Sequence, residues 1–183
     1  MDNNLDLSTY SHSFSKKNKI ARIIWTVVYL FFFRPFATRI FKRWRVLVLK
    51  LFGSKIDWSS HVYASVKIWA PWNLELGKNS CLGPKVECYN QGRIYIGENT
   101  IISQKVYLCA STHNYKLKDF PLILKPITIG NGVWVASAAF IGPSVNIGND
   151  AVVAAKAVVI KNIEKSTIVG GNPAKLIKTR TFE

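Results

Sequence analysis

A six-residue repeat runs through the chain from Ile56 to Val159 and limits what the chain can fold into. A period of six matches neither the period of two of a simple strand nor the 3.6 of a helix, but it is typical of a parallel β-helix. The alternative is an ordinary β-sandwich with scattered Ile-Gly pairs, and the many repeats in phase favour the β-helix. Within four runs, the aliphatic residues that share the spacing are Ile56, Val62 and Ile68; Leu76 and Leu82; Ile96, Ile102 and Leu108; and Ile129, Val135, Ile141, Ile147, Val153 and Val159.

The repeat is interrupted once by a long insertion. From Leu108 to Ile129 there are 21 residues, which is three hexapeptides plus three, so residues 114–126 are predicted to form an extruded loop. Thr112 lies four positions after Leu108, where the repeat places small or β-branched residues that point inward. This spacing predicts that His113 stands on the last rigid step before the loop. Such a histidine is either a solvated turn residue or a proton-transferring group.

The N-terminal segment is basic and aromatic. Residues 23–33 form an apolar run of eleven, whereas a helix that spans a bilayer needs roughly 20 apolar residues. Apolar residues then recur at helical spacing up to Gly53, with Lys and Arg between them. We predict a helical, amphipathic segment over residues 1–55, a β-helix over residues 56–170 and a C-terminal tail over residues 171–183.

Two interpretations of the N-terminal segment remain open, and they are compatible. In one, its helices cap the open end of the β-helix; in the other, residues 16–52 contact an anionic membrane surface. The formal charge of +15 favours acidic partners, but no recognisable motif accompanies it, so we expect no nucleic-acid partner. We see no secretory signal and expect a cytoplasmic protein, peripheral at the inner membrane face under the second interpretation.

The three cysteines, Cys81, Cys88 and Cys109, show neither a CxxC spacing nor a histidine pattern typical of zinc sites. All three fall inside the repeat, where small apolar side chains are needed. We therefore expect structural thiols and no bound metal.

Three stretches carry a resemblance to a known family: PWNLELG at residues 71–77, PITIGNGVWVASAAFIGPSV at residues 126–145, and GGNPAKLIK at residues 170–178. They resemble the left-handed β-helix acyltransferases, in the branch of exopolysaccharide and colanic acid O-acetyltransferases, and more distantly the galactoside and maltose acetyltransferases. The resemblance implies a left-handed coil, a homotrimer with each site between two prisms, and acetyl-CoA as acyl donor. It also implies a sugar acceptor in a polysaccharide, capsule or O-antigen precursor built on a lipid carrier.

The resemblance further implies roles for single residues. His113 is the general base, and the main-chain amide of Ser137 stabilises the oxyanion. Asn90 is expected to hold the acceptor sugar. The coenzyme positions are Ser137, Ala155, Ile160, Lys161, Lys175 and Lys178. Ile160 departs from the family, which often has threonine there, and the two last lysines replace arginines, so they act as point charges.

Other functions fit the same sequence. The acceptor could be a small sugar, an amino sugar or an antibiotic, and the β-helix could be a non-catalytic scaffold. The related γ-carbonic anhydrases need three metal-binding histidines, whereas His12, His61 and His113 are widely spread. His12 and His61 are expected to be structural or exposed. Taken singly, Lys161, Lys175 and Lys178 are also consistent with ordinary solvated surface lysines.

Overall fold

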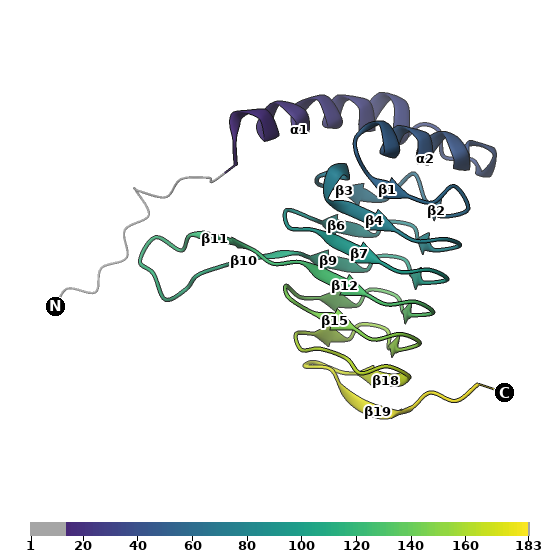
Figure 1. The fold of residues 1–183 in the computed structure, drawn as a ribbon, viewed down its shortest axis with the longest axis vertical. Coiled ribbons are helices and arrows are strands. Elements are labelled where there is room, and N and C mark those ends of the chain that lie inside the picture. The colour runs from purple at the N-terminus through teal and green to yellow at the C-terminus, as the bar shows by residue number, and fades with distance from the viewer. Residues whose placement is uncertain (1–13, 183) are drawn as a thin grey trace.

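The computed structural model describes residues 14–182, which form a three-sided prism of stacked coils below a pair of helices (Figure 1). The helical elements are α1 (Lys16–Val28), the π-helical turn η1 (Tyr29–Phe33), the 3₁₀ turns η2 (Arg39–Phe41) and η3 (Pro71–Asn73), and α2 (Lys42–Leu51). An arm projects from one side of the prism, and its two strands are β10 (Ser111–His113) and β11 (Leu122–Leu124).

The prism has three sheets, and each coil adds one strand to each of them. The first sheet contains β1 (Lys55–Ile56), β4 (Leu74–Leu76), β7 (Ile94–Ile96), β12 (Ile127–Ile129) and β15 (Asn146–Ile147). The second contains β2 (His61–Val62), β5 (Cys81–Leu82), β8 (Ile101–Ile102), β13 (Trp134–Val135), β16 (Val152–Val153), β18 (Thr167–Gly170) and β19 (Lys175–Thr179). The third contains β3 (Lys67–Ile68), β6 (Glu87–Tyr89), β9 (Tyr107–Cys109), β14 (Phe140–Ile141) and β17 (Val158–Val159).

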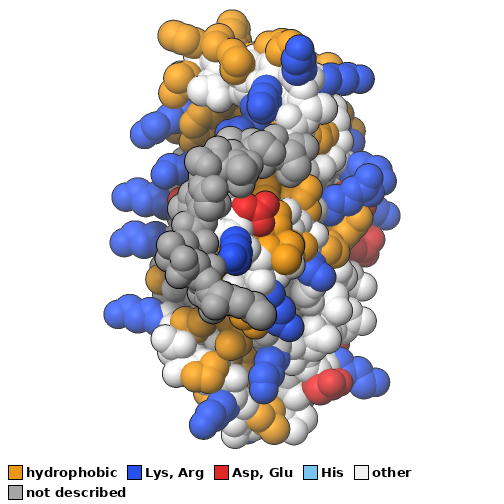
Figure 2. All heavy atoms as spheres, turned by 90° about the vertical axis from the view of Figure 1, so that its left-hand side faces the viewer, with side chains coloured by type: hydrophobic (Ala, Val, Ile, Leu, Met, Phe, Trp, Pro, Cys, Tyr) orange, Lys and Arg blue, Asp and Glu red, His pale blue; other side chains and the backbone are white. Residues whose placement is uncertain are grey.

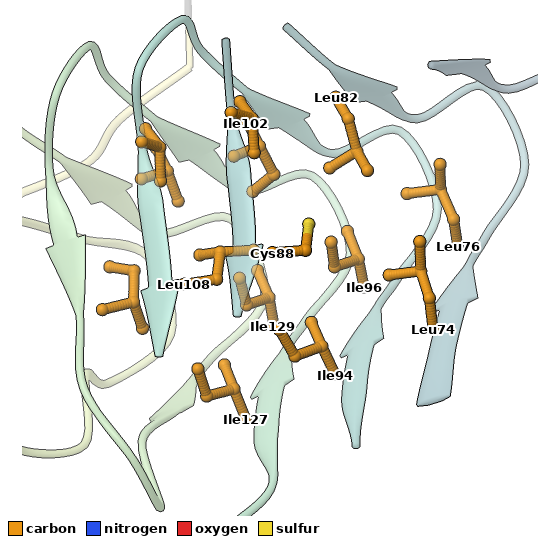
Figure 3. Packing of buried hydrophobic residues seen from close by; sticks show 14 of the residues in the cluster. Leu74, Leu76, Leu82, Cys88, Ile94, Ile96, Ile102, Leu108, Ile127 and Ile129 are labelled. Carbon is orange, nitrogen blue, oxygen red and sulfur yellow. The ribbon is translucent and has the colours of Figure 1, made fainter. Parts of the chain in front are cut away.

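This architecture confirms the parallel β-helix that the six-residue repeat predicted. Strands one coil apart pair in parallel, as Trp134 does with Val152 three hexapeptides further on. All the aliphatic residues of the repeat are at most 5% exposed and meet inside the prism (Figure 3). Burial of each such side chain stabilises the fold by about 1.5–3 kcal/mol, so the stacked coils form one continuous core.

Hydroxyl side chains hold the corner between the first and second sheets. Ser80 Oγ donates to Gly97 O at 2.6 Å and accepts from Thr100 N at 3.0 Å. One coil further on, Thr100 Oγ1 donates to Gly130 O at 2.8 Å and accepts from Val133 N at 3.1 Å. The small position of the repeat therefore also satisfies buried main-chain groups of the next coil.

The helices close the N-terminal end of the prism, as one interpretation of the segment predicted. Trp25, Phe33 and Leu49 are buried in the same apolar cluster as the coils. The indole Nε1 of Trp25 also donates to the carbonyl of Ile68 on β3 at 2.7 Å. Among residues 14–182, no helix has the length and apolar character that a membrane span needs.

Arg45 on α2 ties this helical cap to the first coil. It is 1% exposed, and its guanidinium donates to the carbonyls of Val62 at 2.7 Å and Thr38 at 3.1 Å, and to that of Phe36. Its Nη2 lies 3.4 Å from His61 Nε2. Burial, and then the positive charge of Arg45, lower the pKa of His61 below its ordinary value. His61 is half-buried beside Arg45, which agrees with the first of the two expectations for it, structural or exposed.

The arm begins earlier than the sequence suggested. The predicted loop of residues 114–126 is part of a β-hairpin in which β10 and β11 pair antiparallel. Thr112 is exposed, so the prediction that it points into the prism is wrong. The chain leaves the coil after Ala110, whose carbonyl accepts from Lys125 N at 3.0 Å and closes the root of the arm. His113 therefore lies on the projecting arm rather than on the prism.

The predicted tail of residues 171–183 also differs from expectation. Its strand β19 runs antiparallel to β18 and extends the second sheet. Arg180 then donates to the carbonyls of Gly132 at 2.9 Å and Asp150 at 3.0 Å, which fixes the chain against the turns of two earlier coils.

We predict that Arg45→Met lowers the free energy of unfolding by about 2–4 kcal/mol, because three carbonyls around the guanidinium lose their donor. Urea denaturation followed by circular dichroism measures the change. Arg43→Met is the matched control, since Arg43 is exposed on the same helix and its loss removes the same charge. Equal stability of the two variants would contradict the role of Arg45 in fastening the cap.

Candidate functional site

His113 is oriented by the turn of the arm itself. Its Nδ1 lies 2.6 Å from the carbonyl oxygen of Phe120, and because a carbonyl only accepts, Nδ1 must carry the proton. In the neutral imidazole Nε2 then holds the lone pair, which is the tautomer that can remove a proton at Nε2. The arm is further closed by Asn114 N, which donates to Pro121 O at 2.9 Å. The side chain of His113 is exposed, so a substrate can reach it.

Ser137 and Ala155 lie one coil apart on the edge between the second and third sheets. Lys156 N donates to Ser137 O at 2.9 Å, which stacks the two turns. The amides on either side of Ser137, those of Ala136 and Ala138, donate to carbonyls at 2.8 and 3.0 Å. Within residues 14–182 the N–H of Ser137 has no acceptor, so it can donate to a bound group.

Three of the predicted coenzyme residues come together around one hollow at the C-terminal end of the prism. The hollow has a volume of about 120 Å³ and lies on the edge between the third and first sheets. Ile160, Lys161 and Lys175 line it together with Val159, Ile163, Pro173 and Ala174. Lys178 lies outside it, on β19 opposite Ile168.

The predicted site residues do not all meet in one chain. The arm with His113 leaves the edge between β9 of the third sheet and β12 of the first. Ser137 and Ala155 follow β13 and β16 of the second sheet and therefore lie on a different edge. Within one chain, the candidate base and the candidate oxyanion donor thus face different sides of the prism.

Asn90 has a structural position rather than an open one. It is fully buried, and its Oδ1 accepts from the amides of Trp69 at 3.0 Å and Ala70 at 3.1 Å. Its Nδ2 donates to the carbonyl of Ala70 at 2.6 Å. Because both the oxygen and the nitrogen of the Asn90 amide are already bonded to the main chain of the preceding coil, this conformation does not support contact with an acceptor. His12 lies outside the described residues.

Cys88 and Cys81 are poor candidates for a nucleophile. Burial raises the pKa of the Cys88 thiol to about 12, and burial also raises the pKa of Cys81. A thiol with such a pKa is protonated at neutral pH and a weak nucleophile. Among residues 14–182, the structure brings together no group of three His, Cys, Asp or Glu side chains that could hold a metal ion.

Sequence reasoning missed a second hollow, at the root of the arm. It measures about 350 Å³, and Gln91 and Arg93 line it together with Leu124 from the arm. The one signal in the sequence is the shift of the hexapeptide phase between Cys88 and Ile96, which marks an insertion at this corner.

Comparison with known proteins identifies full-length relatives, although no protein-family model matches the sequence. Over 177 residues the chain is 37% identical to the "Putative colanic acid biosynthesis acetyltransferase WcaF" of Escherichia coli K12, covering 96% of this chain and 97% of that protein. The solved hexapeptide-repeat acetyltransferase VCA0836 of Vibrio cholerae, in complex with acetyl coenzyme A, has a TM-score of 0.81 at 21% identity and covers 94% of both chains. A galactoside acetyltransferase in complex with coenzyme A has a TM-score of 0.81 at 22% identity, covering 93% of this chain and 86% of that one.

The two kinds of likeness carry different information. The solved structures share the coiled prism, and at this identity they bear on the fold alone. The identity to the Escherichia coli relative extends over almost the whole of both proteins, helices and coils included. The chain therefore belongs to the hexapeptide-repeat acetyltransferases.

Proposed function

We propose that the chain transfers an acetyl group from acetyl-CoA to a hydroxyl of a sugar in a polysaccharide, capsule or O-antigen precursor. The observation that carries this proposal is His113, an exposed imidazole whose Nδ1 is held by the Phe120 carbonyl. The name of the full-length relative and the acetyl coenzyme A bound to a structural neighbour support the donor and the acceptor class.

In the proposed reaction, His113 Nε2 removes the proton of the sugar hydroxyl while its oxygen attacks the thioester carbonyl. The new C–O bond forms directly, without an acyl-enzyme. When the C–S bond breaks, the proton passes from His113 to the leaving thiolate, which departs as coenzyme A. The carbonyl oxygen, on which negative charge develops, accepts a hydrogen bond from Ser137 N–H, an amide with no acceptor among residues 14–182.

Acetyl-CoA is proposed to lie along the prism. Exposed Ala155 leaves room for the pantetheine arm, and Ile160, 56% exposed, offers it an apolar contact. Lys161, Lys175 and Lys178 are exposed and attract the phosphates as point charges.

The placement of the site residues supports a homo-oligomer, and we propose a homotrimer. His113 and Ser137 lie on different edges of one prism, so one chain alone does not complete the reaction centre. A neighbouring copy that presents its Ser137 edge to the arm supplies the missing half. Each site then lies between two subunits.

The helical cap is proposed to bind an anionic membrane at the cytoplasmic face, where lipid-linked precursors are built. Opposite its buried Trp25, α1 with the following turn carries apolar side chains that are 47–67% exposed: Ile20, Ile23, Ile24, Val27, Leu30 and Phe31. Figure 2 shows hydrophobic side chains at this end of the molecule with Lys and Arg beside them. The exposed cations of the segment are Lys16, Lys17, Lys19, Arg34, Arg39 and Arg43. An apolar face flanked by cations is the pattern of interfacial helices.

One prediction of the proposed function concerns the base. His113→Ala reduces acetyl transfer to a sugar acceptor by about 10²–10⁴-fold, because the hydroxyl loses its proton acceptor. Thiol release from acetyl-CoA, measured over a panel of sugars, reports the rate. His61→Gln is the control, since His61 packs beside Arg45 in the first coil. Unchanged turnover in His113→Ala removes the proposed base, and no turnover in the natural protein with any acceptor favours a scaffold.

Another prediction concerns the binding of the coenzyme. Lys175→Glu weakens binding of coenzyme A roughly tenfold, because a cation beside the phosphates becomes an anion. Isothermal titration calorimetry at low and high salt measures the change and its screening. Lys165→Glu, an exposed lysine that does not line the hollow, provides the same change of charge. The same affinity in both variants contradicts the assignment.

A further prediction concerns binding to the membrane. The chain sediments with phosphatidylglycerol vesicles, and the double substitution Ile23→Glu and Phe31→Glu lowers the bound fraction at least about fivefold, because charge enters the apolar face. Leu117→Glu is the control, as Leu117 is 50% exposed and belongs to the arm between β10 and β11, which projects from the side of the prism (Figure 1). If the natural protein does not bind these vesicles, the membrane proposal is wrong and the helices serve only to cap the prism.

A further inference from the structure

Gln91, one of the residues that line the hollow at the root of the arm, carries a buried acceptor with no donor. Gln91 is 8% exposed, and its Nε2 donates to the hydroxyl of Tyr89 at 3.0 Å. Its Oε1 has no hydrogen-bond partner within residues 14–182. Leaving a buried oxygen unpaired costs about 1–3 kcal/mol, so a donor from outside the chain is favoured here.

The hollow lies on the same side of the arm as His113. Residues directly opposite each other in an antiparallel pair point to the same face, and so do residues two apart. Ser111 is opposite Leu124 and His113 is opposite Leu122, which puts His113 and Leu124 on one face of the hairpin. Leu124 lines the hollow. Leu124, at the edge of the hollow, is therefore two residues, about 7 Å, along the hairpin from the level of His113.

The walls of the hollow suit a sugar. Leu124, Pro126 and the ring of Tyr95 provide an apolar side against which a pyranose can lay its C–H groups. Gly92 contributes no side chain, and a Cβ at that position would lie 2.5 Å from Ala110 O, so the arm can approach the prism closely. The volume of about 350 Å³ falls at the small end of the range of small-molecule sites.

The charge at the rim selects among sugars. Arg93 is exposed, and its Nη1 lies 3.4 Å from the Tyr95 hydroxyl. Within residues 14–182 there are two ion pairs, Lys55 with Glu75 and Lys67 with Glu87. Glu75 also acts on the charge of Arg93, but no carboxylate of the described residues lies within ion-pair distance of its guanidinium. A planar guanidinium beside an apolar wall is well placed for a carboxylate carried by the ligand.

We infer that this hollow is the subsite for an acidic sugar of the acceptor, a uronic acid. A hydroxyl of the ring donates to Gln91 Oε1, and the uronate carboxylate pairs with Arg93. This inference rests on the proposed function, because it takes the hydroxyl donor to be the acceptor of the acetyl group. The reacting hydroxyl lies on the same sugar or on the residue linked to it, toward His113.

Two methyl glycosides, those of glucuronic acid and of glucose, test the inference because they differ only in the carboxylate. Their binding to the full chain is titrated by saturation-transfer NMR. The natural protein binds the glucuronoside at least about tenfold more tightly, and Arg93→Gln abolishes this preference while keeping the affinity for the glucoside. Gln91→Leu weakens both, since the ring hydroxyl loses its acceptor. Lys165→Gln is the control for the lost charge, because Lys165 is exposed and lines neither hollow.

Equal binding of the two glycosides by the natural protein overturns the inference, as does an Arg93→Gln variant that weakens both alike. Gln91→Leu with undiminished binding also overturns it, and thermal melting checks that each variant is folded. Thiol release from acetyl-CoA is measured on the same samples. Failure to release thiol with any acceptor counts against the proposed function, whereas loss of the glucuronoside preference counts against the subsite.

Discussion

Every part of this molecule depends on the register between successive coils. Main-chain bonds from one coil to the next set it, as where Ile101 N donates to Val133 O at 2.9 Å and Trp134 N to Ala151 O at 3.0 Å. Because side chains alternate between the two faces of a strand, a shift of one residue would turn the inward aliphatic residues to solvent. The core therefore holds the register, and the register aligns the turns that carry chemistry.

The sequence predicted those features of the fold that repeat. The inward position of Val135 or Ile141 follows from a period that the chain shows directly, and the burial of both residues agrees. The role of Asn90 was not predictable in this way, since its partners Trp69 and Ala70 lie in the preceding coil. In the sequence, a polar corner residue that faces solvent cannot be distinguished from one that binds a main-chain amide.

The arm shows the same limit more sharply. The break in the six-residue repeat after Leu108 correctly predicted that the chain leaves the prism there. Thr112 still fits the spacing of inward-pointing residues, but it lies on β10 of the arm. The pairing of β10 with β11 decides this, and pairing depends on strands that the period does not describe. The resemblance to a family supplied roles for His113 and Ser137 and implied a site between two prisms, and the order of the sheets shows which edge each residue occupies.

The arm also gives the proposed site an unusual construction. The carbonyl that orients His113 belongs to Phe120, within the same hairpin, so the base carries its own positioning group with it. The hollow with Gln91 lies at the junction of arm and prism. Base and sugar subsite are thus held by one hairpin against one corner, and the coenzyme residues are held by the stacked turns.

The bonds from the helical cap have a consequence for solubility. The strands β2 and β3 stand at the ends of their sheets, and an uncovered end strand is a template for pairing with another chain. Arg45 binds the carbonyl of Val62 on β2, and Trp25 binds that of Ile68 on β3. These side chains occupy hydrogen-bonding positions that a further coil would use. The cap therefore blocks the addition of a coil by filling its hydrogen-bonding positions as well as its space. Without it, prisms could add end to end and grow as fibres.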